Sequence, residues 1–402
     1  MKSSQKKTKV NMIFKDLLVV ELASVLAGPS VGQFFAEQGA DVIKVENPKT
    51  QGDVTRSWKS VDETTGDISA YFSTVNWGKQ SLALDYSTKE GLDVLYTILE
   101  KADIVIVSFK PGDDKKLKVD YDSLKRVNPN LIYGSITGYG ENDDRAGYDA
   151  MIQAESGFMY INGEAEGLPT KLPVALVDVL AGHQLKEALL LAYINFLKTG
   201  KGQKVSVSLF DTAVSSLANQ ATNWLVGHKE PQRKGSLHPN IAPYGEVFTT
   251  RDEKLIILAV GNDKQFKNLC ELLELKNLIA DRRFVDNKSR VTYRNQLHQE
   301  LQVVIKTMQG SNLIQALNRY KIPGAEIKKV SEAINAFKSN LLSSDSLKGI
   351  PTFVGKLENQ PKSSHFLPPP HFGEHTTSIL MEKTGLNQQK IDDLKRLSVI
   401  YL

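Results

Sequence analysis

Short runs of β-branched and other apolar residues recur through the first half of the chain, and segments with helical spacing separate them. We interpret these runs as buried strands, because they are short and end at Gly, Pro or Asp. Alternating strands and helices predict an α/β fold, a doubly wound and mostly parallel sheet with helices on both faces. The predicted strands are Leu17–Leu22, Asp41–Val45, Ser81–Asp85, Asp103–Ser108, Leu131–Ile136 and Val205–Leu209.

Helix signals lie between these strands. Pro29 suits the first turn of a helix that ends at Gly39. Ser87 and Glu90 have the spacing of a capping box. Apolar residues recur at helical spacing from Leu185 onward and form one broad stripe. The predicted helices are Pro29–Gln38, Ser87–Glu100, Tyr121–Val127, His183–Lys198 and Asp211–Trp224.

The pattern changes after Val226. Gly227–Asn240 is polar and contains Pro and Gly, which is typical of a linker. Beyond it we predict a hairpin (Glu246–Thr250 with Leu255–Val260), helices (Gln265–Leu273, Thr292–Met308 and Asn312–Lys321), an extended Pro-rich stretch (Ile350–Pro370) and a final helix pair (His375–Thr384 and Gln388–Leu394). The predicted domains are a large one at 13–226, a linker at 227–245, a smaller α+β domain at 246–330, and a return linker with C-terminal helices at 331–402 that rejoin the large domain.

Composition narrows the function classes. The 402 residues are 41% apolar and 24% charged, as in ordinary globular proteins, and the net charge of +4 favours small anionic ligands over nucleic acid. The lone Cys270 excludes an internal disulfide, fits a core position, and suits a reducing cytoplasm. The basic N-terminus lacks the apolar core of a secretory signal. No apolar run approaches the roughly 20 residues of a membrane span, so we expect a cytoplasmic protein without membrane contact.

One carboxylate, Asp178, stands inside the apolar run LPVALVDVLAG at Leu172–Gly182. A strand-like segment leads into it and a helix leads out. Removing a carboxylate from water is costly unless the group is paired or hydrogen-bonded, so a charge has no packing reason to be there. Asp178 either caps the following helix or acts as a nucleophile, and spacing alone favours the cap.

Polar loops follow the predicted strands. In an open parallel sheet, ligands bind outside the carboxyl ends of the strands. Lysines in and beside these loops predict a polyanionic ligand, although for each lysine taken singly a solvated surface charge is the favoured interpretation. The loops are Leu26–Pro29, Asn47–Arg56, Phe109–Lys118, Thr137–Arg145 and the turn at Asp178, and the lysines are Lys79, Lys110, Lys115, Lys116 and Lys118.

From about Phe14 to Leu394 the chain resembles the class III CoA-transferases, the family of formyl-CoA transferase and carnitine CoA-transferase. Ten segments carry the resemblance, in order. They are LASVLAGPSVGQFFAEQGADVIKVENP with GDVTR, NWGKQSLALD, FKPG, LIYGSITGYG, YDAMIQAESG, LPVALVDVLAG, HPNIAPYGEVF, AVGNDKQF, DRRFVDN and PPPHFGEHT.

The resemblance implies two domains joined by two long linkers, and two chains threaded into an interlocked homodimer. It implies that Asp178 is the catalytic aspartate. CoA contacts carry over onto Leu26, Ala27, Asn47, Lys79, Phe109 and Lys116. Leu26, Asn47 and Thr137 replace the glutamine, arginine and lysine of formyl-CoA transferase, and its glycine-rich lid loop is absent, which disfavours formyl-CoA and oxalate chemistry.

The implied reaction moves CoA from an acyl-CoA to a carboxylic acid. The aspartate attacks the thioester and becomes an aspartyl-CoA thioester, so one hard acyl transfer is divided into easier steps. A helix start would keep Asp178 ionised. The CoA thioester is a substrate, and we expect no permanently bound cofactor and no metal. A dicarboxylic acyl group such as succinyl is the expected donor.

Three other functions compete with CoA transfer. A 2-methylacyl-CoA racemase of the same fold needs a histidine base before the QAESG stretch, but Tyr148 stands there and no histidine precedes His183. A phenol with a pKa near 10 is a poor base at neutral pH. A non-catalytic CoA-binding protein would not need Asp178. A CoA-thioester hydrolase would use water as the acceptor.

Several further residues have two interpretations. Arg56 and Arg145 could pair with a substrate carboxylate or lie on the surface. His238 and Tyr244 could reach a partner's site in a threaded dimer, although a structural role is favoured. We interpret the remaining candidates as structural: His371 and His375 have metal-like spacing, but Pro and Gly around them oppose one helix, and Trp58 and Trp77 are expected to be packing residues.

Overall fold

The computed structural model describes residues 12–344, 347–358 and 366–402. The chain divides into two compact units. The first contains the described residues up to Phe158, together with Leu172–His228 and Ser339–Leu402. The second contains Met159–Lys171 and Lys229–Lys338.

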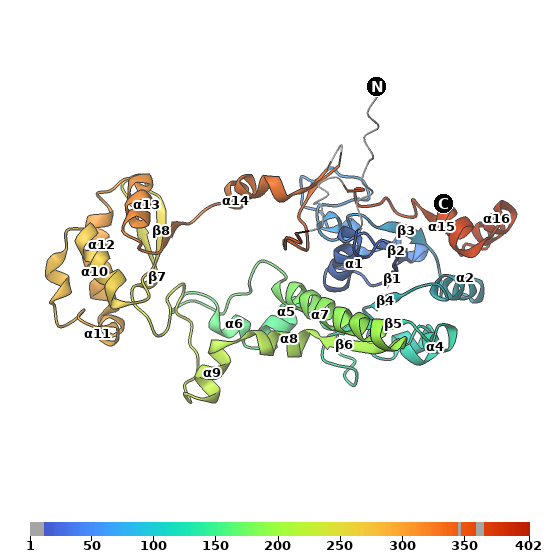
Figure 1. Cartoon of the computed structure of the whole chain (residues 1–402), viewed down its shortest axis with the longest axis horizontal. Coiled ribbons are helices and arrows are strands. Elements are labelled where there is room, and N and C mark those ends of the chain that lie inside the picture. The colour runs from blue at the N-terminus through green and yellow to red at the C-terminus, as the bar shows by residue number, and fades with distance from the viewer. Residues whose placement is uncertain (1–11, 345–346, 359–365) are drawn as a thin grey trace, which may run out of the picture. The chain divides into compact units, whose positions relative to one another are not determined.

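A six-stranded parallel sheet forms the centre of the first unit, in the order β3-β2-β1-β4-β5-β6 (Figure 1). Its central strands are fully buried and consist of Val, Ile and Leu, apart from Glu21 in β1, as expected for a sheet covered on both faces. The α/β fold and the parallel sheet are therefore confirmed. The strands are β1 (Leu18–Leu22), β2 (Asp41–Glu46), β3 (Gln80–Ala83), β4 (Ile104–Val107), β5 (Ile132–Thr137) and β6 (Lys204–Ser208).

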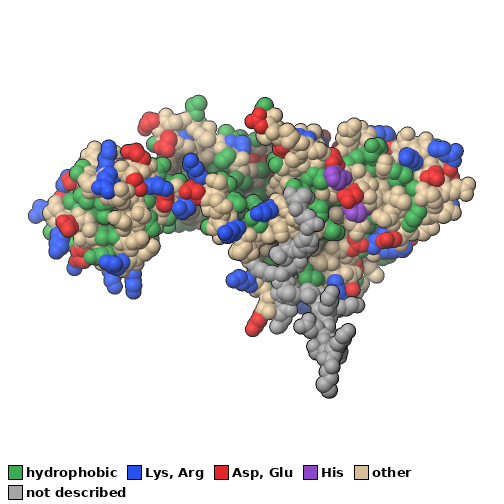
Figure 2. All heavy atoms as spheres, turned by 90° about the horizontal axis from the view of Figure 1, so that it is seen from above, with side chains coloured by type: hydrophobic (Ala, Val, Ile, Leu, Met, Phe, Trp, Pro, Cys, Tyr) green, Lys and Arg blue, Asp and Glu red, His purple; other side chains and the backbone are tan. Residues whose placement is uncertain are grey.

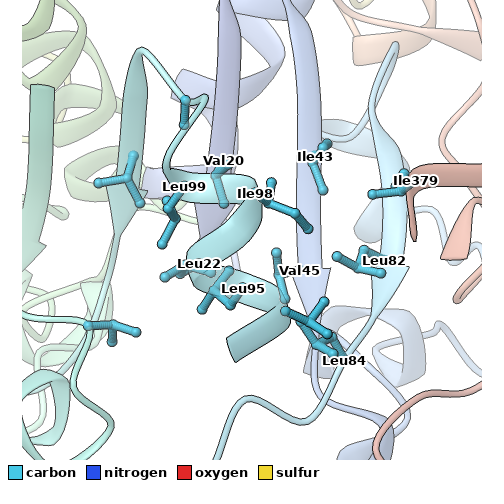
Figure 3. Packing of buried hydrophobic residues seen from close by; sticks show 14 of the residues in the cluster. Val20, Leu22, Ile43, Val45, Leu82, Leu84, Leu95, Ile98, Leu99 and Ile379 are labelled. Carbon is cyan, nitrogen blue, oxygen red and sulfur yellow. The ribbon is translucent and has the colours of Figure 1, made fainter. Parts of the chain in front are cut away.

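Alternate residues along the strands belong to two separate hydrophobic cores, one on each face of the sheet. Val20 belongs to the cluster shown in Figure 3, while its neighbour Val19 belongs to the cluster on the other face. The Val20 face is covered by α2 (Lys89–Leu99), α4 (Tyr121–Val127), α15 (Thr376–Ile379) and α16 (Gln388–Arg396). The Val19 face is covered by α1 (Ala27–Glu37), α7 (Leu176–Thr199) and α8 (Leu209–Ser216). The sheet is thus doubly wound.

Three local predictions were wrong. The segment before Asp178 is not a strand, because α7 already begins at Leu176. Thr88, not Ser87, caps α2, and its hydroxyl accepts the amide of Gly91. The helix predicted over 211–224 is broken at Ala218, whose φ of +50° ends the helical run between α8 and α9 (Asn219–Leu225).

The second unit has its own core. An antiparallel sheet of β7 (Tyr244–Thr249), β8 (Leu255–Ala259) and β9 (Gly324–Glu326) confirms the predicted hairpin. Cys270 is buried in this core, as expected. The helices are α10 (Asp263–Leu272), α11 (Asn287–Thr292), α12 (Arg294–Ile305), α13 (Gly310–Arg319) and α14 (Val330–Phe337).

The C-terminal segment returns to the first unit. Part of the stretch predicted as extended, residues 359–365, lies outside the described residues. Before it, the amides of Thr352 and Phe353 donate to the Glu37 carboxylate on α1. The final helix pair is confirmed, and the amide of Asp85 donates to the Val399 carbonyl beyond it.

The remaining elements are small. In the first unit they are α3 (Asp113–Lys116), α5 (Asp149–Glu155), β10 (Leu342–Ser343), β11 (Lys348–Gly349) and a π-helical turn at Leu380–Thr384. Helix α6 (Phe158–Ile161) begins at the last residue before the chain passes into the second unit.

Surface charge is mixed. Figure 2 shows Lys and Arg side chains interspersed with Asp and Glu on the face that it draws. Among the helices of the described residues, none combines the length and apolar character that a membrane span requires.

Candidate active site

A cavity of about 340 Å³ opens at the carboxyl edge of the sheet, entirely within the first unit. The loops that follow β1, β2, β4 and β5 contribute to it, together with the first turns of α5, α7 and α8. This is the edge where open parallel sheets bind ligands. The walls comprise Ser24–Gly28, Ser108–Pro111, Ile136–Gly138 and Arg145–Asp149, with Val54, Trp58, Asp178 and Leu209.

Asp178 lies in the cavity wall, in the first turn of α7. The N-cap of that helix is Ala175, which has no side-chain oxygen, and no side chain caps the helix from that position. The prediction that Asp178 caps the helix is therefore wrong. A carboxylate that has no capping role and faces a cavity needs another explanation.

Asp149 supplies the bond that a cap would have made. Its Oδ1 accepts the amide of Val177 at 2.9 Å, and its Oδ2 accepts Gln153 Nε2 at 2.7 Å. Gln153 Oε1 in turn accepts the amide of Leu172 at 2.8 Å. Helix α5 thus holds both the segment before α7 and the first turn of α7, which fixes the position of Asp178.

Burial dominates the ionisation of Asp178. The residue is only 9% exposed, and this burial, together with the negative charge of Asp149, raises the pKa of its carboxyl to about 7. The expectation that the helix start keeps it ionised is therefore wrong, because burial and the Asp149 charge shift this carboxyl toward its protonated form. Among the described residues, no hydrogen bond to its carboxylate offsets the burial.

Three of the residues that the resemblance associates with CoA lie together. Leu26, Ala27 and Phe109 all line the cavity that contains Asp178. Asn47 and Lys116 do not line it. The Asn47 side chain accepts the amide of Lys49, and exposed Lys116 pairs with Asp113 at 2.8 Å.

Lys79 is placed where it cannot meet a ligand from solvent. Its ammonium is completely buried, 2.8 Å from Glu21, and it also donates to Asn76 and to the Pro29 carbonyl. A buried ammonium with these three protein partners does not fit the CoA contact that the resemblance implied for Lys79. Of the predicted lysines, only Lys110 lines the cavity, while Lys115 lines a neighbouring cavity of about 290 Å³.

The two loop arginines differ. Arg56 is buried and bonds Glu46 with two nitrogens, at 2.7 and 2.8 Å, and its guanidinium lies over the Phe72 ring. It is neither a surface arginine nor free to bind a substrate carboxylate. Arg145 is 53% exposed, lines the cavity, and pairs with Asp143 and Glu155.

The aromatic candidates also differ in burial and in whether they line the cavity. Trp77 is fully buried, as a packing residue should be. Trp58 was expected to be a packing residue too, but it is exposed, lines the cavity and contacts Tyr71 edge to face. Tyr148 lines the cavity and is 62% exposed.

The histidine candidates contact other protein groups. In the second unit, the His238 ring lies 5.0 Å from the Tyr244 ring. In the first unit, His371 contacts Asp67 at 2.6 Å, and His375 Nδ1 accepts the amide of Ser81. Over the part of the chain that the structure describes, no group of three or more His, Cys, Asp or Glu side chains could hold a metal ion.

Sequence reasoning missed Asp149 and the buried charges beneath the cavity. Asp149 was visible only as a member of the YDAMIQAESG segment, and nothing local to that segment links it to α7. The pair formed by Lys44 and Asp53, at 2.9 Å, was hidden because both residues lie in segments that otherwise indicate a strand and a polar loop.

A parallel α/β sheet with a buried carboxylate in a cavity at its strand ends is typical of an enzyme. The chain belongs to CoA-transferase family III, whose sequence model matches residues 14–376. Together with relatives that are named CoA-transferases, this membership makes the protein an enzyme, a class III CoA-transferase.

Named relatives and a solved structure match most of the chain. The succinate–glutarate CoA-transferase of Agrobacterium fabrum is 38% identical and the alignment covers 90% of this chain and 94% of that protein. The human succinyl-CoA:glutarate CoA-transferase is 31% identical, covering 95% and 88%. A crystal structure of a CAIB/BAIF family protein from Brucella suis superposes with a TM-score of 0.82 at 38% identity, covering 93% of this chain and all of that one.

Proposed function

We propose that this enzyme moves CoA from a dicarboxylyl-CoA, with succinyl-CoA as the first candidate, to a second carboxylic acid. Asp178 is the proposed nucleophile. The observation that carries the proposal is its carboxylate in the wall of a cavity that Leu26, Ala27 and Phe109 also line. The names of the relatives from Agrobacterium and human support the choice of succinyl and glutarate as the first acids to test.

The proposed reaction needs no group outside Asp178 and the two substrates. The ionised carboxylate attacks the acyl-CoA carbonyl, which gives a mixed anhydride and CoA thiolate. The thiolate then attacks the aspartyl carbonyl, which releases the first acid and leaves an aspartyl-CoA thioester. The acceptor carboxylate attacks this thioester to form a second anhydride, and the thiolate attacks its acyl carbonyl, which regenerates Asp178.

The surroundings of Asp178 support this role. Burial leaves the carboxylate little hydration to lose when it attacks, and it limits the access of water to the anhydride and the thioester. The bond from Val177 to Asp149 holds the backbone beside the nucleophile. Only the ionised form attacks, so the pKa of about 7 makes the reactive fraction sensitive to pH near neutrality.

Rival reactions lack comparable support. A racemase would require a base at Tyr148, which is an exposed phenol. In a CoA-binding protein without activity, a buried carboxylate that has no hydrogen-bond partner among the described residues would only cost free energy. A hydrolase differs only in using water as acceptor, and rapid thiol release without an acceptor acid would favour it.

A donor-by-acceptor panel tests the proposal. Succinyl-CoA, acetyl-CoA and oxalyl-CoA are each combined with glutarate, oxalate and other acids, and the exchanged CoA esters are identified by mass spectrometry. Exchange should be fast with a dicarboxylyl donor and abolished in Asp178→Ala, whose circular dichroism should match the parent. Exchange that persists in Asp178→Ala contradicts the mechanism.

We further propose that two chains form an interlocked homodimer and that the enzyme acts in the cytoplasm. Large apolar side chains are exposed on α7 and α9 of the first unit, which supports an interface there. These side chains are Leu191, Leu197, Trp224 and Leu225. The proposed cytoplasmic location rests on the single cysteine, which suits a reducing compartment.

A further inference from the structure

The turn from β1 into α1 contains a strained residue at the cavity wall. Val25 has a φ of +72°, in the left-handed region that β-branched residues rarely adopt. It immediately precedes Leu26 and Ala27, and all three residues line the cavity. Such strain persists only where surrounding contacts impose it, and it concentrates at ligand sites.

Two buried charges bond to the backbone of this turn. The amide of Val25 donates to both carboxylate oxygens of Asp53, at 3.3 and 3.2 Å. Lys44 Nζ pairs with Asp53 at 2.9 Å and also donates to the Ala23 carbonyl at 2.8 Å. The backbone is therefore held on both sides of residue 24, by an ion pair with almost no exposed surface.

Asp53 also fixes a second wall of the same cavity. It is the N-cap of the turn Val54–Ser57, and its Oδ1 accepts both the amide and the hydroxyl of Thr55. Val54 and Trp58, at the two ends of that turn, line the cavity. One carboxylate thus sets the spacing between the Val25 wall and the Trp58 wall.

The charges around Asp53 keep it ionised. Burial alone would raise the pKa of its carboxyl, but the Lys44 ammonium and the Thr55 donors hold that pKa below its usual value. Lys44 itself faces Glu21 at 2.9 Å, and Glu21 also pairs with Lys79. Lys79, which the sequence suggested as a ligand contact, thus completes the buried network that supports the loop.

We propose that Asp53 and Lys44 are positioning residues for CoA binding: they hold Val25 in its left-handed conformation, and this presents Leu26 and Ala27 to the CoA moiety. The inference rests on the proposed function of the cavity. The buried ion pair acts through the Val25 loop, because it touches neither the nucleophile nor, directly, the ligand.

A double-mutant cycle tests the proposal by calorimetric titration with free coenzyme A. Asp53→Asn keeps the shape of the side chain but removes the ion pair and weakens the hold on the Val25 amide, so CoA affinity should fall about tenfold. In a Val25→Gly background, where the left-handed conformation carries no strain, the same change should cost less than about threefold. Equal losses in both backgrounds overturn the proposal.

Further variants guard against a folding defect. Thr55→Val removes one donor to Asp53 and should weaken CoA binding in the same direction by a smaller factor. Asp103→Asn is the matched control, because Asp103 Oδ2 also accepts a backbone amide, that of Leu18 at the start of β1, but Asp103 does not line the cavity. Its CoA affinity should stay within about twofold of the parent.

Hydrogen exchange separates this inference from the proposed function. In Asp53→Asn, the Val25 amide should exchange faster than in the parent, while amides in the middle of β1 should not change. An unchanged exchange rate at Val25 overturns the inference. A parent chain that binds no CoA contradicts the proposed function, and the exchange measurement still tests what holds the loop.

Discussion

At the scale of one residue, the burial of Asp178 has two opposing effects on its proposed role as nucleophile. Its burial shields the proposed anhydride from water, but the same burial raises the pKa of the carboxyl to about 7 and protonates part of the nucleophile. The rate of CoA transfer should therefore rise with pH, reach half of its maximum near pH 7 and level off about one pH unit higher, in the manner of a single ionisation.

The same ionisation affects stability. The unfolded-state pKa of an aspartate is about 3.9, and the folded-state value is about 7, so the folded chain binds this proton more tightly. The stabilisation that the bound proton gives the folded state is complete below pH 4 and is lost as pH rises through 7. The Asn side chain of Asp178→Asn does not ionise, so that variant does not lose stability in this way. Its free energy of unfolding relative to the parent should increase by up to about 4 kcal/mol between pH 4 and pH 8 in urea titrations. A difference that is constant with pH would argue against a raised pKa.

Asp149 offers a second test at this scale. Asp149→Asn keeps an oxygen for the Val177 amide but removes the charge that helps to raise the pKa of Asp178. The midpoint of the pH–rate profile should move to lower pH, and the plateau rate should change less. Gln153→Leu, which breaks the bond to Asp149 but leaves the charge, should not produce that shift. A profile that stays in place for Asp149→Asn contradicts this assignment.

At the scale of elements, local signals predicted strands and most helices but not the groups that hold them. The sequence identified Asp178 as unusual, yet its role as a cap could not be judged. The amide of Val177 is bonded by Asp149, which is 28 residues away. Likewise, lysines in neighbouring loops cannot be told apart in the sequence, but Lys79 is buried and pairs with Glu21, whereas Lys110 lines the cavity. Such long-range contacts have no period or spacing to read.

The contact between α1 and the returning chain gives a prediction for an element. Glu37 accepts the amides of Thr352 and Phe353, and Glu37→Ala would leave both without this partner. Stability should fall by about 1–3 kcal/mol, and a protease should cut near these residues more readily. The control Glu100→Ala, at an exposed helix end, should change stability by less than about 0.5 kcal/mol. Equal protease resistance in the Glu37→Ala variant and the parent would show that the contact does not hold the segment.

At the scale of the whole molecule, the doubly wound sheet was predictable because its strands are short, apolar and separated by helices. The assembly was implied only by family resemblance, since the pairing of two chains leaves no periodic signal. Sedimentation should give twice the 44.6 kDa chain mass, and the mass should persist on dilution because interlocked chains separate only by unfolding. A species of the single-chain mass contradicts the interlocked homodimer.

Exposed apolar residues allow a sharper test of that assembly. Leu225→Asp places a charge on α9, where the side chain is 68% exposed in the single chain, and it should reduce the yield of dimer after refolding. Val61→Asp is the control, because Val61 is fully exposed but lies in a loop outside α7 and α9. Equal dimer yields from the two variants would place the interface elsewhere.

The most direct test of the account is to trap the proposed covalent intermediate. The enzyme is mixed with succinyl-CoA without an acceptor, quenched with hydroxylamine, digested and mapped by mass spectrometry. An aspartyl-CoA thioester predicts a hydroxamate on Asp178, and only when an acyl-CoA is present. A label on Asp149 or another carboxylate would contradict Asp178 as the nucleophile, and so would the absence of any label on an enzyme that exchanges CoA rapidly once an acceptor acid is added.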